Sequence, residues 1–209
     1  MSKKPIDPAR LIPVEQLPAL RQQAEQQAFV NVARLNRATR KSATLGDDAL
    51  EIARLPLSQR IRYNKLVKLV DEASKDIMPF TACRKGCSHC CNIAALITEV
   101  EAQRISEVIG RKPAKVGAFP PDVPALQDKY FGVPCTFLKG GRCSIYEVRP
   151  IACRVHFSMA DDGFFCSTAI APQNSLVPAL NLLGVDKALF MMTMGSKFAD
   201  IRDFFPPKK

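Results

Sequence analysis

The sequence predicts a mainly α-helical protein with a small β-hairpin, whose centre is a metal-stapled cysteine-cluster core flanked by helices. Three observations predict this class. Amphipathic stretches with helix-capping signals lie before and after the cysteine-rich segment. The segment Lys139-Gly140-Gly141-Arg142 separates two short apolar runs, as in a hairpin. Eight cysteines occur among 209 residues, four of them between positions 83 and 91.

The residues before the cysteines predict three helices. Residues 20–41 are rich in Gln, Ala and Arg and favour the first helix. Asp48 and Glu51 have the spacing of a capping box, which would open a short helix that stops at Pro56. Ser58 can cap a third helix with an apolar stripe.

Further elements follow the first cysteines. Thr98 and Glu101 form a clear capping box at the start of another helix. Residues 111–134 contain five prolines and predict a long loop. Pro150 suits the first turn of a short helix. The apolar residues 174–194 predict a last helix.

These elements divide the chain into three regions. Residues 1–77 form a basic helical N-terminal region, 78–170 a cysteine-cluster metal-binding domain, and 171–209 a C-terminal helical segment that packs on the core. The chain carries a formal net charge of +10. More than half of this excess lies in residues 1–75, which contain no cysteine.

No segment of the sequence predicts membrane insertion. The most apolar stretch, 177–194, is interrupted by polar and charged residues, whereas a spanning helix needs about 20 nearly continuous apolar residues. The N-terminus has prolines where a signal peptide has its apolar run. We therefore expect a cytoplasmic protein without a membrane partner. Thiols stay reduced in that compartment, so the cysteines indicate metal or redox chemistry more than disulfides.

The first cysteine group has the pattern Cys83-x3-Cys87-x2-Cys90-Cys91. On a helix, at about 100° per residue, all four thiols would fall within roughly 100° of one face. Alternatively, Gly86 opens the helix into a cysteine-rich turn. In either case, four crowded thiolates repel one another unless a cation neutralises them. The pattern therefore predicts a metal centre.

The second group is more widely spaced, and with it the chain has eight candidate metal ligands. Eight thiolates suit two tetrahedral zinc sites, or one or two iron–sulfur clusters. Adjacent side chains such as Cys90 and Cys91 diverge, so we expect sites that mix thiols of both groups. The candidate ligands are Cys83, Cys87, Cys90, Cys91, Cys135, Cys143, Cys153 and Cys166.

Two details of the ligand set stay open. A strict two-residue turn would point Cys135 and Cys143 to opposite faces of a regular hairpin, so sharing one centre would need an odd loop or a bulge. His89 and His156 are each able to bind zinc or iron. Because enough thiols are present, we expect both imidazoles to face solvent or to support a ligand from outside the coordination sphere.

The motifs resemble those of the bacterial YkgJ-type cysteine-cluster family. The resemblance covers about residues 80–166 and rests on both cysteine groups and on the Ile145-Tyr146-Glu147-x-Arg149-Pro150 segment. It implies a zinc- or iron-chelating domain whose ligands are the eight cysteines. The chain is also distantly similar to the cysteine-rich part of flagellin lysine N-methylase. The family pattern is often written with two residues between its first cysteines, and this chain has three.

Three functions follow as hypotheses, and whether the protein is an enzyme stays open. The first is a metal-binding protein with a multi-cysteine iron–sulfur or zinc centre, in redox chemistry, metal handling or protein modification; we favour iron over zinc. The second is a structural zinc module that binds an unidentified protein partner or, less favoured, nucleic acid through Arg37, Arg40 and Lys41. The third, implied only by the resemblance, is a metal-dependent protein methylase-like enzyme.

Overall fold

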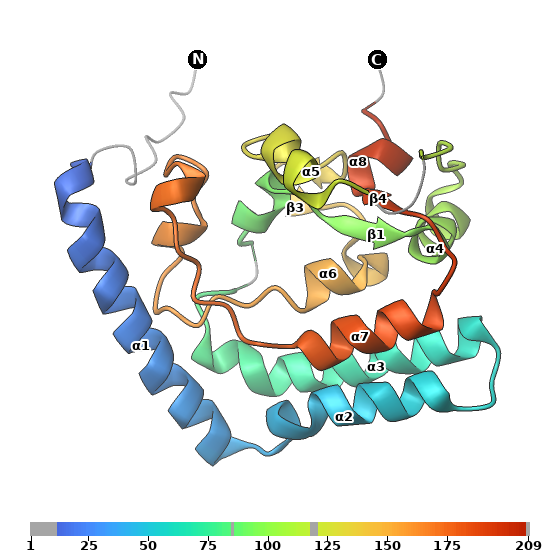
Figure 1. Cartoon of the computed structure of the whole chain (residues 1–209), viewed down its shortest axis with the longest axis horizontal. Coiled ribbons are helices and arrows are strands. Elements are labelled where there is room, and N and C mark those ends of the chain that lie inside the picture. Colours follow the sequence, from blue (N-terminus) through green and yellow to red (C-terminus); the bar gives the residue numbers. More distant parts are fainter. Residues whose placement is uncertain (1–11, 85, 118–120, 208–209) are drawn as a thin grey trace.

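A computed structural model describes residues 12–84, 86–117 and 121–207 and shows a mainly helical fold with two small antiparallel sheets (Figure 1). The α-helices are α1 (Leu17–Ala38), α2 (Lys41–Arg54), α3 (Gln59–Ile77), α4 (Glu99–Ile109), α5 (Val123–Tyr130), α6 (Ile151–Arg154), α7 (Leu183–Met192) and α8 (Ile201–Phe204). The strands are β1 (Leu96–Thr98), β2 (Leu138–Lys139), β3 (Arg142–Cys143) and β4 (Phe198–Asp200). Short 3₁₀ helices are η2 (Val14–Gln16), η3 (Met78–Phe80), η4 (His89–Asn92), η5 (Tyr146–Val148), η6 (Phe164–Cys166) and η7 (Pro172–Asn174). This arrangement confirms the predicted mainly α-helical class with a small β-hairpin.

One layer of the molecule consists of α2, α3 and α7, which lie side by side along one edge (Figure 1). Its apolar core includes Leu45 of α2, Leu66 of α3 and Val185 of α7, each at most 1% exposed. α2 and α7 touch through backbone atoms, because a Cβ placed on Gly184 would lie 2.5 Å from the Cα of Gly46. Two glycines therefore set the distance between these helices.

A second layer forms around β1 and β4, which pair antiparallel with Leu96 opposite Asp200. Here α4 and α8 cover a core that includes Ile97, Ile105 and Phe204. α6 lies between the two layers in Figure 1 and contacts both α3 and β1. The pairing of β1 with β4 was not predicted from the sequence, because each strand has only three residues.

Helix α1 runs along the side of the molecule and packs on the segment that contains the last cysteine (Figure 1). Leu17 and Ala24 contact a cluster with Phe165 and Ile170. Further along α1, the buried Asn31 donates a hydrogen bond of 2.9 Å to the carbonyl of Met159. The N-terminal helix is thus attached to residues 159–170.

Two predicted helix starts are confirmed. The Ser58 hydroxyl accepts a hydrogen bond of 3.4 Å from the backbone N–H of Ile61 at the start of α3. At α4, the Thr98 hydroxyl accepts from the backbone N–H of Glu101, whose carboxylate accepts from the N–H of Thr98 in return. Local side-chain chemistry determined both starts, which is why sequence reasoning found them.

Two other helices begin at places that the sequence did not predict. α2 starts at Lys41, so Asp48 lies inside the helix, where it accepts from the Thr44 hydroxyl at 3.0 Å. The proline-rich segment 111–134 contains α5, which is capped by Asp122 and has a proline in its first turn. Proline is compatible with the first turn of a helix. The number of prolines in segment 111–134 was therefore not sufficient to predict a long loop.

The last predicted helix is shorter than expected. α7 begins at Leu183, whereas residues 175–182 run alongside another loop. There Met159 donates to the carbonyl of Pro178 at 2.8 Å, and Leu180 donates to that of Phe157 at 3.2 Å. Tertiary hydrogen bonds replace helical ones in this segment. Within the part of the chain that the structure describes, no helix combines the length and apolar character needed to cross a membrane.

Candidate metal centre

The first cysteine stretch is a turn followed by a 3₁₀ helix, and not a single α-helix. Gly86 has a φ of 92°, a left-handed conformation that favours glycine, and η4 begins at His89. Cys90 and Cys91 lie on η4, while Cys83 precedes the turn. The stretch is tied down by a hydrogen bond of 2.9 Å from the N–H of Ala82 to the carbonyl of Ser158. Of the two conformations considered, the structure shows the turn.

The second stretch lies directly against the first. The N–H of Cys135 donates to the carbonyl of Cys91 at 2.7 Å, and the N–H of Gly132 donates to that of Asn92 at 2.7 Å. Two segments at least forty positions apart are therefore joined through their backbones beside their cysteines. This contact brings the two cysteine groups into one neighbourhood.

The hairpin forms as predicted, but it positions its cysteines differently. Gly140 and Gly141, both with positive φ, form a two-residue loop that sets Leu138 opposite Cys143. Cys135 precedes the hairpin in a turn closed by a 2.9 Å hydrogen bond from the N–H of Leu138 to the Cys135 carbonyl. The condition on loop length therefore does not apply, because Cys135 is not a strand residue.

Four thiols form what we call the inner set. Every pair within this set interacts electrostatically, so that an ionised thiol raises the pKa of its neighbours. Two of its members also pack against the apolar cluster around Ile97. The inner set consists of Cys91, Cys135, Cys143 and Cys153.

Three other thiols form the outer set, which consists of Cys83, Cys87 and Cys166. Charges on Cys83 and Cys87 act on the thiol of Cys166, and Cys87 is exposed. Cys90 lies between the sets: its thiol donates to that of Cys91 and also interacts with Cys87 and Cys153. The expectation that the adjacent side chains of Cys90 and Cys91 diverge is therefore not met, because their thiols share a hydrogen bond.

Most of these thiols are protonated at neutral pH. Burial raises the pKa of Cys166 to about 11 and also raises the pKa of Cys153. The hydrogen bond with Cys91 and burial raise the pKa of Cys90. Cys91 differs, because the hydrogen bond from Cys90 and the charge of Arg202 lower its pKa to about 7, despite burial. The inner set therefore contains one thiol that ionises easily.

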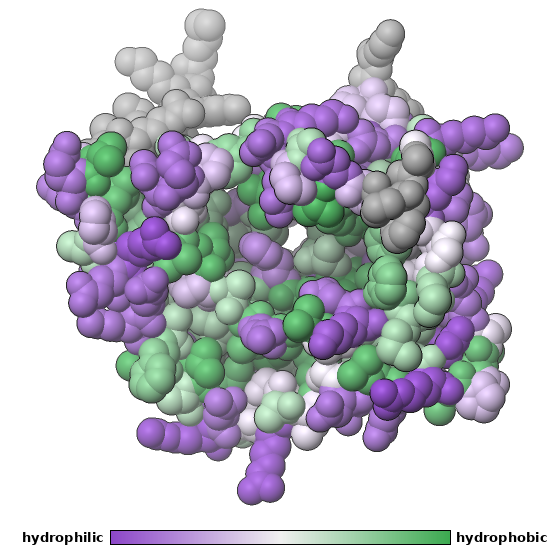
Figure 2. All heavy atoms as spheres, viewed as in Figure 1, coloured by the Kyte–Doolittle hydropathy of each residue, from purple (hydrophilic) through white to green (hydrophobic). Residues whose placement is uncertain are grey.

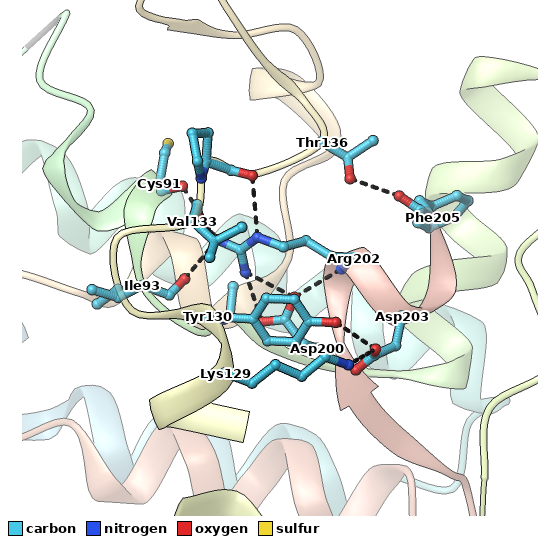
Figure 3. A network of polar contacts seen from close by, with 12 residues as sticks. Cys91, Ile93, Lys129, Tyr130, Val133, Thr136, Asp200, Arg202, Asp203 and Phe205 are labelled. Carbon is cyan, nitrogen blue, oxygen red and sulfur yellow. Dashed lines mark hydrogen bonds and ion pairs between the residues drawn. The ribbon is translucent and has the colours of Figure 1, made fainter. Parts of the chain in front are cut away.

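Arg202 connects the two cysteine-bearing stretches (Figure 3). Its guanidinium, 4% exposed, forms an ion pair with both carboxylate oxygens of Asp200 at 2.8 and 2.9 Å. The Nη2 atom donates to the carbonyls of Cys91, Ile93 and Val133 at 3.3, 3.0 and 2.7 Å. One side chain from the C-terminal segment thus binds the backbone on both sides of the inner set. The sequence analysis did not identify Arg202, because a single Asp-x-Arg motif near a C-terminus has no spacing that is characteristic of a functional site.

A second buried arginine supports the inner set from α6. Arg154 follows Cys153 directly, is 5% exposed, and forms an ion pair with Asp71 of α3. Its other nitrogens donate to the carbonyls of Arg149 and Glu147 at 2.8 and 2.6 Å. The charges of Arg149 and Arg154 lower the pKa of Cys143 against the larger effect of burial. Cationic groups thus offset negative charge on the inner thiols.

The thiols are near one another without being arranged as ligands of one ion. Among the described residues, no three His, Cys, Asp or Glu side chains are positioned to hold a metal. The donor chemistry nevertheless fits zinc or iron, because all eight cysteines are free thiols and cationic groups surround them. Binding would require the thiols to lose protons and turn toward a shared ion.

The two histidines lie beside the outer set. The ring of His89 faces Gly163, where an added Cβ would lie 3.3 Å from the imidazole Cδ2. His156 lines a cavity together with Cys90 and Cys166, and its carbonyl accepts from the Cys83 thiol at 3.7 Å. None of these contacts of the two histidines involves a thiol of the inner set.

A comparison with known families found a match for the segment that contains all eight cysteines. Residues 82–171 match the CxxCxxCC family, described as "Putative zinc- or iron-chelating domain". The match makes this segment similar to the domains of that cysteine-cluster family. The matched segment has three residues, not two, between its first two cysteines. Asp200 and Arg202 lie outside the domain. Neither a curated protein nor a solved structure matches the chain.

Proposed function

We propose that the chain is a metal-binding protein whose eight cysteines hold two neighbouring thiolate centres. The observation that carries the proposal is the inner set, in which thiols from η4, the turn before β2, β3 and α6 all interact with one another. An apolar core offers no reason to gather four thiols. Four thiolates are a complete ligand set for a tetrahedral zinc ion or for a four-iron cluster.

The outer set supplies the second centre. Cys83, Cys87 and Cys166 provide three thiolates, and Cys90 adjoins both sets. The mixture of early and late cysteines in each set agrees with the expectation that the two groups share metals. The bound ions would join short segments that lie far apart in the sequence, so metal binding would contribute directly to folding.

We place iron ahead of zinc as the resident metal. Eight thiols in one neighbourhood, with Cys90 beside both sets, suit a multi-iron cluster better than isolated zinc ions. When bound, an iron–sulfur cluster would supply one-electron chemistry and a zinc ion would supply a rigid crosslink. Either centre with four thiolates carries a net charge of about −2, which Arg202 and Arg154 offset. Redox chemistry, metal handling and protein modification remain hypotheses for its use.

Anaerobic purification followed by elemental analysis and an absorption spectrum tests this proposal. We expect stoichiometric iron with broad visible absorption; stoichiometric zinc without colour would overturn the preference for iron. Cys153→Ser should remove the inner metal and Cys87→Ser the outer one. Val108→Ala, at an exposed position, is the control. Full metal content in both cysteine variants would contradict the proposal.

A second candidate function is nucleic-acid binding beside the cysteines. Arg34 and Arg37 line a groove of about 670 Å³ together with Thr81 and Asp161. The groove lies between α1 and the segment leading to Cys83. Binding of a duplex to phosphate contacts should weaken steeply with added salt and should be lost in an Arg34→Glu, Arg37→Glu variant. Absence of salt-sensitive binding would exclude this function.

A further inference from the structure

Helix α7 is apolar on two opposite sides. The side that is buried in the layer with α2 and α3 consists of Val185, Ala188, Leu189 and Met192. On the opposite side, Leu183 and Phe190 are 53% and 49% exposed, and Met194, two residues past the helix, is 70% exposed. In Figure 2, apolar surface is exposed where α7 lies in Figure 1, with hydrophilic side chains among it. A helix that is apolar all round is normally enclosed on every side, so the outer side of α7 is a candidate for contact with another molecule.

The exposed residues follow one line along the helix. The outer stripe, as we call this line, consists of Leu183, Lys187, Phe190 and Met194. Their separations are four, three and four positions, so at about 100° per residue they lie within roughly 60° of one another around the helix axis. The N–H of Thr193 donates to the carbonyl of Leu189 at 3.0 Å, so helical hydrogen bonding continues to the residue before Met194.

The outer stripe continues onto a neighbouring strand but covers a small area. The rings of Phe190 and of Phe198 in β4 stack with their centroids 6.2 Å apart. Met191, which is also exposed, borders the stripe. Contiguous exposed apolar surface is typical of protein–protein contacts. A helix of ten residues is about 15 Å long, which is short for a standard interface of ~800 Å² per partner, so a contact through this surface would be weak.

The spacing of the outer stripe is the same when it is read in either direction. When two copies of α7 pack antiparallel across a two-fold axis, Leu183 of each copy therefore lies opposite Met194 of the other. In the same arrangement, Lys187 of each copy lies opposite Phe190 of the other. In a parallel pair, by contrast, the two Lys187 side chains would face each other and repel. The stripe is thus complementary to itself in the antiparallel orientation.

The charges of α7 also favour the antiparallel orientation. The helix has two charged residues, Asp186 and Lys187. An ammonium group opposite Phe190 of the second copy faces an aromatic ring, and such rings attract cations. Asp186 lies one helical turn before Phe190, so a carboxylate of the second copy borders the same ring. Both attractions occur twice, because the two-fold axis repeats every contact.

We propose that the outer stripe of α7 binds the outer stripe of a second copy of this chain, antiparallel and across a two-fold axis. The pairing covers the exposed apolar residues at both ends of each stripe. It does not depend on metal binding, because α7 contains no cysteine and lies in a layer with its own apolar core. Since the contact area is small, the dimer is reversible, with a dissociation constant in the micromolar range.

Sedimentation equilibrium under reducing conditions tests this pairing. We expect the average mass of the wild type to rise with concentration from that of one chain toward that of two. Leu183→Lys and Met194→Glu should each raise the dissociation constant at least about tenfold, because a charge then faces an apolar residue twice in each dimer. The double variant should recover most of the affinity, since only in the antiparallel register does each introduced ammonium face an introduced carboxylate. Phe29→Lys, at an exposed position on α1, should behave like the wild type.

The possible outcomes decide for or against the pairing. A wild type that stays monomeric at every concentration would overturn the proposal in favour of a different protein partner. Dimers that persist equally in both single variants would show that another surface pairs, and would overturn it as well. A folded double variant that dimerises no better than the single variants would exclude the antiparallel register. If circular dichroism shows that a charged variant does not fold, the Leu183→Ala, Met194→Ala variant decides, and dimerisation equal to that of the wild type would contradict the proposal.

Discussion

The carboxylate of Glu101 accepts a hydrogen bond of 2.8 Å from the backbone N–H of Ile151, fifty residues further along the chain. Glu101 is 1% exposed and also accepts hydrogen bonds from the Tyr63 hydroxyl and from Thr98. One carboxylate thereby joins α3, the start of α4 and the start of α6. Because α6 contains Cys153, a residue recognised in the sequence as a local cap also positions the helix of a proposed metal ligand.

Glu101 gives the folded protein a pH dependence. Burial raises its pKa above the ordinary 4.5, although its hydrogen bonds lower it in part. The folded state therefore binds this proton more tightly than the unfolded state, so the contribution of Glu101 to stability decreases as pH rises from 4.5 through the raised pKa. We expect the free energy of unfolding of the wild type, relative to Glu101→Gln, to decrease over that range. A difference that is flat or rises with pH in denaturant titrations would contradict this prediction.

Arg202→Lys should destabilise the protein and release metal from the inner set. Lysine has a single side-chain nitrogen, which cannot bind both carboxylate oxygens of Asp200 and also reach the carbonyls of Cys91 and Val133. Breaking a buried ion pair costs about 3–5 kcal/mol. Thermal unfolding and metal content measure the two effects. Arg142→Lys, at an exposed position near Cys143, should change neither. Full stability and metal content in Arg202→Lys would show that the ion pair is dispensable.

Because α2 and α7 contact through their backbones, we expect one added methyl group at this contact to destabilise the folded protein strongly. In Gly184→Ala, the new Cβ would lie 2.5 Å from the Cα of Gly46, so the helices must separate. Overpacking of this kind costs about 1–3 kcal/mol. Gly117→Ala is the matched control, since an added Cβ there meets nothing within 4 Å. Equal midpoints of chemical unfolding for the two variants would refute the prediction.

Metal removal should loosen the cysteine domain before the layer of α2, α3 and α7. The cysteines lie on short turns, strands and helices of at most four residues, whereas that layer consists of long helices with their own apolar core. After chelation, amide hydrogen exchange should increase at residues 83–91 and 135–153 more than in α3. A uniform increase along the chain would instead indicate that the metals stabilise the whole protein as one unit.

Several elements were predictable because their signals are local. Ser58, Thr98 and Glu101 cap helices through bonds to residues three positions away, and the Gly140-Gly141 turn closes a hairpin between its neighbours. The start of α2 and the existence of α5 were not predicted. In α2 the buried positions Leu45 and Ala49 pack on other helices, and this tertiary contact outweighed the capping signal at Asp48.

The amino-acid sequence alone determined the mainly α class, the hairpin and the family of the cysteine segment, because capping, turn formation and motif spacing involve residues close in the chain. Only the tertiary structure decided how the thiols divide into an inner and an outer set, since that division depends on contacts such as Cys135 with Cys91. It also revealed Arg202, which donates to backbone carbonyls that lie 68 to 111 positions away. Such contacts leave no periodic pattern in a sequence, because folding brings the partners together through packing of intervening elements.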